Sequence, residues 1–192
     1  METNIEIDRT FDGDYDCQVL DEMPNGTAIS YLPAQPQQVG QDGILVRISP
    51  TKGVPWVGLF SSIKKYPGAL SRVMFTPNPN LVCVICSGDA VITDVVSPDQ
   101  YTLLDFEPIT DAIAVKERKM IVFAGFTKLV ALDGSGVIWE TSRVAWDELR
   151  ITGVDNSRVI GEYWDVATEK QVQFDLSLAT GEVDGGVDES AF

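Results

Sequence analysis

The chain of 192 residues contains no histidine. Histidine is the commonest general base and the commonest metal ligand in proteins, and it belongs to the usual nucleophilic triads. Zinc sites built on histidine are therefore excluded, and a site built on cysteine alone would need four thiols where the chain has three. P-loop, dinucleotide-binding and Gly-x-Ser-x-Gly motifs are also absent. We therefore expect no cofactor and no resident metal, and we favour a non-catalytic function.

Long hydrophobic runs are absent as well, since no apolar stretch approaches the roughly 20 residues of a membrane span. The first residues show neither the basic start nor the apolar stretch of a secretory signal. We expect a cytoplasmic protein with no membrane partner and with reduced thiols. Cys83 and Cys86 lie three apart in one apolar strand, so their side chains point to opposite faces. The sequence predicts them as small core residues, not as a metal or disulfide pair.

Positive charge is scarce, with 14 lysines and arginines against 29 acidic residues and a net charge of −15. The excess lies at the ends, because residues 1–22 hold eight acids and one base and residues 181–192 hold four acids and no base. This argues against nucleic acid as a partner, which would require clustered basic residues. It is compatible with a protein partner, in particular a basic one, although solvated acidic tails are the interpretation that the charge favours.

A pattern that recurs every 39 residues is the main positive feature of the chain. Residues 75–86, 114–125 and 153–164 align as a polar turn followed by a short apolar strand, and a second strand follows in each copy. A fixed period of this size indicates repeated supersecondary units, because one unit cannot bury its apolar face alone.

Short strands separated by Gly, Asp and Asn turns predict an all-β fold made of repeated antiparallel hairpins. A further hairpin is expected at 43–60, and only residues 144–150 have helical character. We predict a partial or open β-propeller-like arrangement, with a β-sandwich as the alternative. The expected domains are an acidic, Pro/Gln-rich segment at 1–42, a β-repeat domain at 43–183 and an acidic tail at 184–192. Within the first segment we expect an extended connector at 31–38 and two short strands.

The sequence Leu-Val-Ala-Leu-Asp-Gly-Ser-Gly-Val-Ile-Trp at 129–139 resembles the repeat of quinoprotein-like (PQQ-type) β-propellers. Residues 174–183 look like a second copy. Residues 139–149 and 55–58 are also similar to a bacterial family of β-rich proteins of unassigned function. The resemblance implies a fold and no activity. A quinone site needs a complete ring, and a closed propeller usually needs at least four blades where the chain shows three copies and one hairpin.

The four tryptophans are candidates for core or contact residues. Trp56 and Trp139 are predicted between sheets because they lie in strands. Trp146 lies in the polar segment before the third copy of the repeat. There, together with Arg143, Asp147 and Glu148, it forms the candidate interaction surface, since tryptophan and arginine dominate binding energy in protein interfaces.

Two functions remain open on the sequence alone. The first is a cytoplasmic protein-binding module, in one version an immunity-type protein that neutralises a basic partner, and a homo-oligomer is compatible with it. The alternative is a carboxylate-based hydrolase with a cleft between sheets, which would need a close Asp/Glu pair with a raised pKa. The motif Ser-Ser-Ile-Lys at 61–64 matches the nucleophile motif of penicillin-binding enzymes, but its companion motifs are absent. We interpret that match as chance.

Overall fold

The computed structural model describes residues 5–33, 43–62, 64 and 66–187. These residues form strands and one 3-10 turn, η1, with no α-helix among them, which confirms the predicted all-β class. The elements are β1 (Glu6–Asp8), β2 (Tyr15–Leu20), β3 (Ile29–Leu32), β4 (Gly43–Pro50), β5 (Trp56–Ser61), β6 (Arg72–Phe75), β7 (Leu81–Cys86), β8 (Asp89–Asp94), β9 (Tyr101–Leu103), β10 (Asp111–Val115), η1 (Lys116–Arg118), β11 (Met120–Ala124), β12 (Leu129–Asp133), β13 (Gly136–Glu140), β14 (Arg150–Val154), β15 (Arg158–Asp165), β16 (Lys170–Ser177) and β17 (Val183–Asp184).

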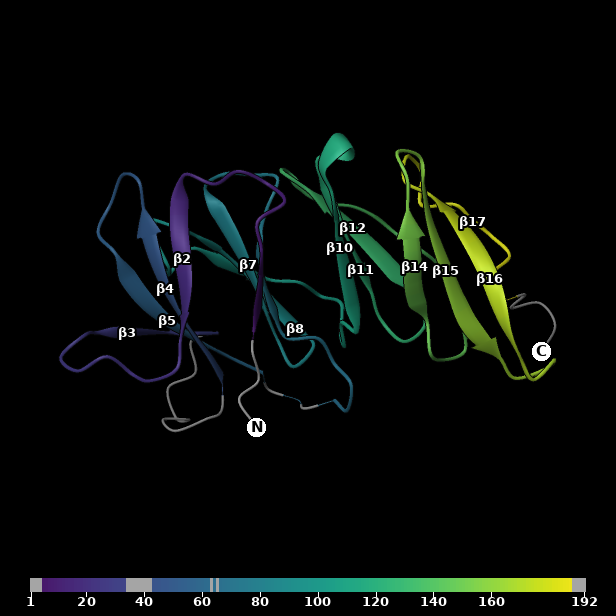
Figure 1. Cartoon of the computed structure of the whole chain (residues 1–192), viewed down its shortest axis with the longest axis horizontal. Coiled ribbons are helices and arrows are strands. Elements are labelled where there is room, and N and C mark those ends of the chain that lie inside the picture. Colours follow the sequence, from purple (N-terminus) through teal and green to yellow (C-terminus); the bar gives the residue numbers. More distant parts are fainter. Residues whose placement is uncertain (1–4, 34–42, 63, 65, 188–192) are drawn as a thin grey trace. The chain divides into compact units, whose positions relative to one another are not determined.

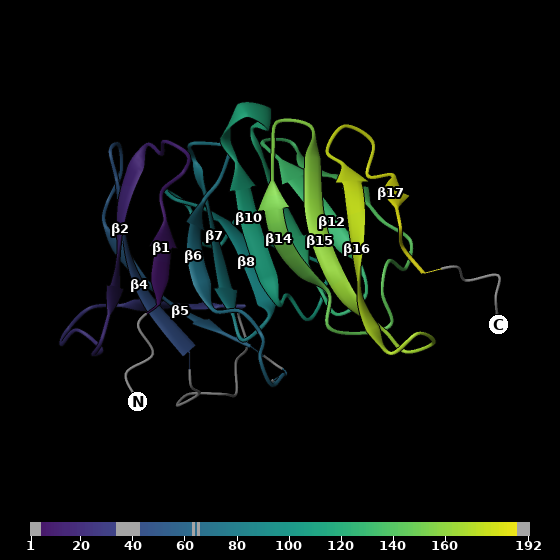
Figure 2. The same ribbon diagram turned by 45° about the vertical axis from the view of Figure 1, so that its right-hand side comes forward.

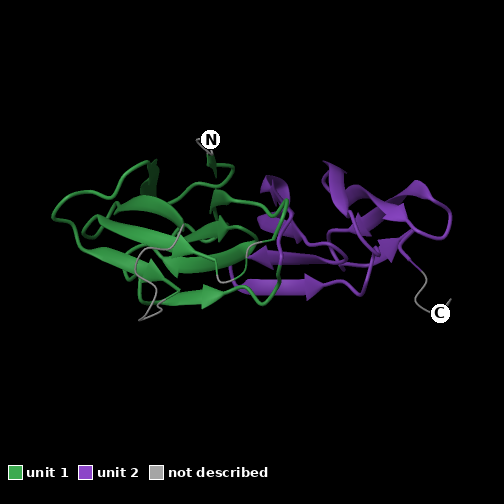
Figure 3. Ribbon diagram, turned by 90° about the horizontal axis from the view of Figure 1, so that it is seen from below, with its two compact units in different colours: residues 1–107 green, residues 108–192 purple. Residues whose placement is uncertain are grey.

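The chain divides into two compact units, residues 1–107 and 108–192 (Figure 3). Unit 1 contains sheet A, with strand order β1-β6-β7-β8-β9, and sheet B, with strand order β2-β4-β5-β3. Unit 2 contains sheet C, β10-β11-β12-β13, and sheet D, β14-β15-β16-β17. No sheet closes into a barrel within the described ranges. The boundary after Glu107 falls inside the range 43–183 that the sequence predicts as one β-repeat domain.

The 39-residue repeat corresponds to one sheet. The three copies fall in the strand sets β6–β9, β10–β13 and β14–β17, one copy in each set. Each copy starts at the end of the first strand of its set and runs through most or all of the second strand. In each set, strands that follow one another in the chain pair antiparallel. The order is easy to follow in sheet D, where β14, β15 and β16 lie side by side (Figures 1 and 2). The prediction of repeated antiparallel hairpins is therefore confirmed, and so is the separate hairpin at 43–60, which forms β4 and β5.

The N-terminal segment 1–42 contributes strands to both sheets of unit 1. The two short strands expected there are present as β1 and β2, and β3 is a third. Two pairs are parallel, β1 with β6 and β3 with β5, which differs from the purely antiparallel sheets that the sequence predicts. Both pairs join strands that are distant in sequence, so no hairpin fixes their direction. Most of the connector expected at 31–38 and the end of the tail at 184–192 lie outside the described residues.

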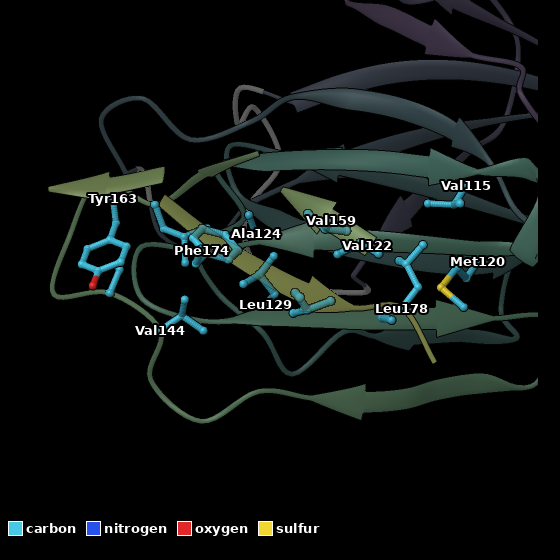
Figure 4. Packing of buried hydrophobic residues seen from close by; sticks show 14 residues of the cluster. Val115, Met120, Val122, Ala124, Leu129, Val144, Val159, Tyr163, Phe174 and Leu178 are labelled. Carbon is cyan, nitrogen blue, oxygen red and sulfur yellow. The ribbon is translucent and has the colours of Figure 1, made fainter. Parts of the chain in front are cut away.

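Unit 2 has a core formed by side chains from both of its sheets. On β15 the burial alternates, with Val159 and Tyr163 buried and Arg158 and Ile160 exposed, as expected for a strand with one solvated face. Figure 4 shows Phe174 of sheet D among residues of sheet C that include Leu129. The two sheets of unit 2 therefore bury their apolar faces against each other, as expected when a single repeat unit cannot bury its own.

Two tryptophans link the sheets within each unit in the same way. Trp56 of β5 donates its indole N–H to the carbonyl of Val95, just after β8, at 2.8 Å. Trp139 of β13 donates to the carbonyl of Leu178, just after β16, at 3.1 Å. Each acceptor lies 39 residues beyond its donor, which is the repeat length. Both tryptophans lie between sheets as predicted, but they are half-buried at the edge of the core and not fully buried within it. Trp139 packs against the core of unit 2, so each tryptophan acts as an inter-sheet clamp through its hydrogen bond.

The three cysteines are free and buried, and the burial of Cys83 and Cys86 confirms their prediction as core residues. Burial raises the pKa of the Cys83 thiol to about 12, and it raises the pKa of Cys17 to about 11. The neutral thiols are therefore core residues with little nucleophilic character. No helix in the described part of the chain is long and apolar enough to cross a membrane.

Candidate functional site

The predicted helix at 144–150 is wrong, because the segment is an irregular loop held by the core. The amides of Val144 and Ala145 both donate to the carbonyl of Thr127, at 2.7 and 3.2 Å, and Val187 donates its amide to the carbonyl of Val144. These tertiary bonds replace the local i to i−4 pattern that a helix would need. Residues 141–149 are here called the Trp146 loop. Val144, Ala145 and Leu149 of this loop are buried, so their packing fixes its position on unit 2.

The Trp146 loop carries all four residues predicted as an interaction surface. Arg143, Asp147 and Glu148 are exposed, and Trp146 is half-buried. The guanidinium carbon of Arg143 lies 4.8 Å from the centroid of the Trp146 ring, which is a cation–π arrangement. Asp147 accepts a hydrogen bond from the amide of Glu148, whose φ of 54° is left-handed. The structure thus brings the four side chains onto one loop with a defined backbone, while their role in binding stays a prediction.

A second feature, which the sequence analysis did not identify, is a cavity of about 340 Å³ in unit 1. Its apolar wall includes Val91, Leu103 and Leu104 from β8 and the end of sheet A, and its carboxylates are Asp89, Asp105 and Glu107. We call it the acidic cavity. No motif or spacing marks these residues in the sequence, because β8 and the segment after β9 meet only through strand pairing.

The acidic cavity contains the two carboxylates that a carboxylate hydrolase would need. Glu107 and Asp89 both line it, and Asp89 influences the pKa of Glu107. However, Lys64 donates a hydrogen bond to Glu107, and this contact is the largest cause that holds the pKa of Glu107 below its usual range. A general acid at neutral pH needs the opposite shift. The pKa shift of Glu107 therefore does not favour a role as the general acid of a carboxylate hydrolase.

The Ser-x-x-Lys segment does not form a nucleophile site. The lysine of this motif would have to contact the hydroxyl of Ser61, the first residue of the motif, to activate it. The ammonium group of Lys64 is instead bonded to Glu107. The neighbouring Ser62 donates its hydroxyl to the carboxylate of Asp89 at 2.7 Å. The motif at 61–64 instead supplies polar groups to the rim of the acidic cavity.

Several exposed aspartates are committed to turns. Asp165 accepts hydrogen bonds from the amides of Ala167 and Thr168 and from the Thr168 hydroxyl, and these bonds lower its pKa. Asp133 and Asp155 cap their turns in the same way, with lowered pKa values. These carboxylates stay ionised and define the hairpin ends, which makes them poor candidates for acid–base chemistry.

Among the described residues, no three His, Cys, Asp or Glu side chains are grouped so that they could hold a metal ion. No protein-family model matches the chain, and no curated protein matches it either. The resemblance of residues 129–139 to PQQ-type propeller repeats therefore stays a prediction, and the function has to be argued from the structure itself.

Proposed function

We propose that the chain is a cytoplasmic, non-catalytic interaction module that binds a basic protein. The observation that carries this proposal is the Trp146 loop, where an arginine stacks on an aromatic ring and the neighbouring residues Val144 and Ala145 are buried and hydrogen-bonded to Thr127. Tryptophan and arginine are the residue types that most often dominate binding energy, and a fixed loop loses little entropy on binding.

The charge of the chain supports a basic partner. A net charge of −15 attracts positively charged proteins, speeds their association and disfavours acidic competitors. One specific form is an immunity-type protein that neutralises a basic toxin by presenting carboxylates where the toxin would otherwise bind phosphate. The immunity-type form of the proposal rests on charge alone, whereas the Trp146 loop supports the general proposal of a protein-binding module.

Replacing Trp146 with alanine is expected to weaken binding of the partner by about 30-fold, because a central interface tryptophan contributes roughly 2 kcal/mol. The partner is first identified by affinity capture from the source cells and mass spectrometry, and its affinity is then measured by calorimetry. Trp164→Ala is the matched control, since Trp164 is an exposed tryptophan on β15 in the same unit. Equal affinities of the Trp146→Ala variant and the unchanged chain would exclude the loop as the contact surface.

The carboxylate hydrolase remains the alternative because Asp89 and Glu107 meet in a cavity. Its test is a panel of glycoside and ester substrates with the unchanged chain and a Glu107→Gln variant. We expect no turnover by either protein. Hydrolysis that Glu107→Gln abolishes would establish the alternative.

A further inference from the structure

The acidic cavity of unit 1 combines two kinds of surface. One wall is apolar, with Val91 buried on β8 and Leu103 47% exposed on the edge strand β9. The rim carries Asp89, Asp105 and Glu107. A volume of about 340 Å³ is at the lower end of the range for sites that enclose small molecules, and it is sufficient for one long side chain.

The rim already binds one cation of the chain itself. The ammonium group of Lys64 is paired with Glu107, although both side chains are largely solvated, at 57% and 40% exposure. The site is therefore complementary to an ammonium or guanidinium group. Asp105 is exposed and has no hydrogen bond or ion pair with any other described residue. Asp105 can therefore bind a second cation without losing an existing contact.

We propose that the acidic cavity accepts a lysine or arginine side chain of the partner protein. The aliphatic stem would lie along Val91 and Leu103, and the charged group would lie between Asp105 and Glu107, where it competes with Lys64. Long basic side chains bury their stems on apolar surface in this way. The inference rests on the proposed binding of a basic protein, and it adds a second contact site with a defined chemistry.

Other occupants fit the cavity less well. A nucleic-acid phosphate would meet three carboxylates, and an uncharged apolar group would make no favourable contact with the charge of Asp105. A metal ion would need several grouped ligands, and the described residues provide no such group. Charge complementarity therefore selects a cationic side chain.

The test uses N-acetyl-arginine amide and N-acetyl-lysine amide as probes, with N-acetyl-citrulline amide as the neutral control of the same shape. NMR titration of the full-length, nitrogen-labelled chain should show saturable shifts at the amides of Ala90, Val91 and Leu103–Asp105 with the cationic probes. A dissociation constant on the order of 1–10 mM is expected for a single side chain. Equal shifts with citrulline amide, or no shifts at these amides, would overturn the proposal.

Three exposed variants sharpen the test. Asp105→Asn should weaken the arginine probe about fivefold, whereas Asp99→Asn, on the exposed turn before β9, should leave its affinity unchanged. Lys64→Met should tighten the probe about threefold, because an internal competitor for Glu107 is removed. Unchanged or weaker binding by Lys64→Met would contradict the assigned geometry.

The two proposals can fail separately. If a captured partner binds the Asp105→Asn and Lys64→Met variants as tightly as the unchanged chain, the cavity is not its contact site, and protein binding stands without it. If the arginine probe binds at the cavity but no protein is captured, the cavity recognises cationic groups and the proposed function is wrong.

Discussion

Gly161→Ala is expected to destabilise unit 2 by about 3 kcal/mol or more, since overpacking against backbone is costly. A β-carbon at Gly161 would lie 2.2 Å from Cζ of Phe174 and 2.5 Å from the carbonyl oxygen of Arg150. Gly161 pairs directly with Phe174 across β15 and β16, and the Phe174 ring covers the space that a side chain would occupy. Neither contact is relieved by a small movement, because Phe174 is only 2% exposed and Arg150 contributes main chain.

Gly153→Ala is the matched control for this prediction. Gly153 lies in the neighbouring strand β14 of the same sheet, and an added β-carbon there would meet no atom within 4 Å. Its effect should stay within about 1 kcal/mol. Urea denaturation followed by far-UV circular dichroism measures both variants. Equal stability of the two variants would show that sheet D does not pack as described.

Trp139→Ala is expected to lower the stability of unit 2 by about 3 kcal/mol, the lower end of the range for aromatic deletions, because Trp139 is half-buried. The ring joins sheet C to sheet D through its hydrogen bond to Leu178. It also covers Gly181, where a β-carbon would lie 2.9 Å from the ring. The deletion removes both the packing and the hydrogen bond.

Two further substitutions separate these contributions. Trp139→Phe keeps most of the ring contact but loses the hydrogen-bond donor. The lost hydrogen bond should lower the free energy of unfolding by about 1 kcal/mol, in addition to the small effect of the smaller ring. Trp164→Ala, on the solvated face of β15, should cost less than about 1 kcal/mol. Circular dichroism is the suitable probe because both alanine variants remove a fluorophore. A Trp139→Ala variant no less stable than Trp164→Ala would rule out the inter-sheet clamp.

The sequence predicts the sheets well because the repeat and the alternation of apolar residues are local signals. Val159 and Tyr163 alternate with exposed neighbours, and the turn residues between strands fix the hairpins. The parallel pairs of β1 and β3 could not be predicted, because no local signal links a three-residue or four-residue strand to a partner distant in the chain. The loop at 144–150 has helical spacing, yet hydrogen bonds to Thr127 and the left-handed Glu148 override it.

The two candidate sites also differ in how far the sequence alone could predict them. The Trp146 loop could be named in advance because its residue types alone suggest a contact surface, and the structure adds the Arg143 stack. The acidic cavity could not, since Asp89 and Glu107 meet only after β8 and β9 have paired. The direction of the Glu107 pKa shift likewise depends on Lys64, which is 43 residues away in the chain.

The dependence of partner affinity on salt tests the central claim most directly. The captured partner is titrated with the full-length chain from about 0.05 to 1 M sodium chloride, a range over which the screening length falls from roughly 14 to 3 Å. Binding of a basic protein by a chain of net charge −15 should weaken by at least about tenfold across this range. An affinity that stays constant up to 1 M salt would contradict recognition of a basic partner by charge.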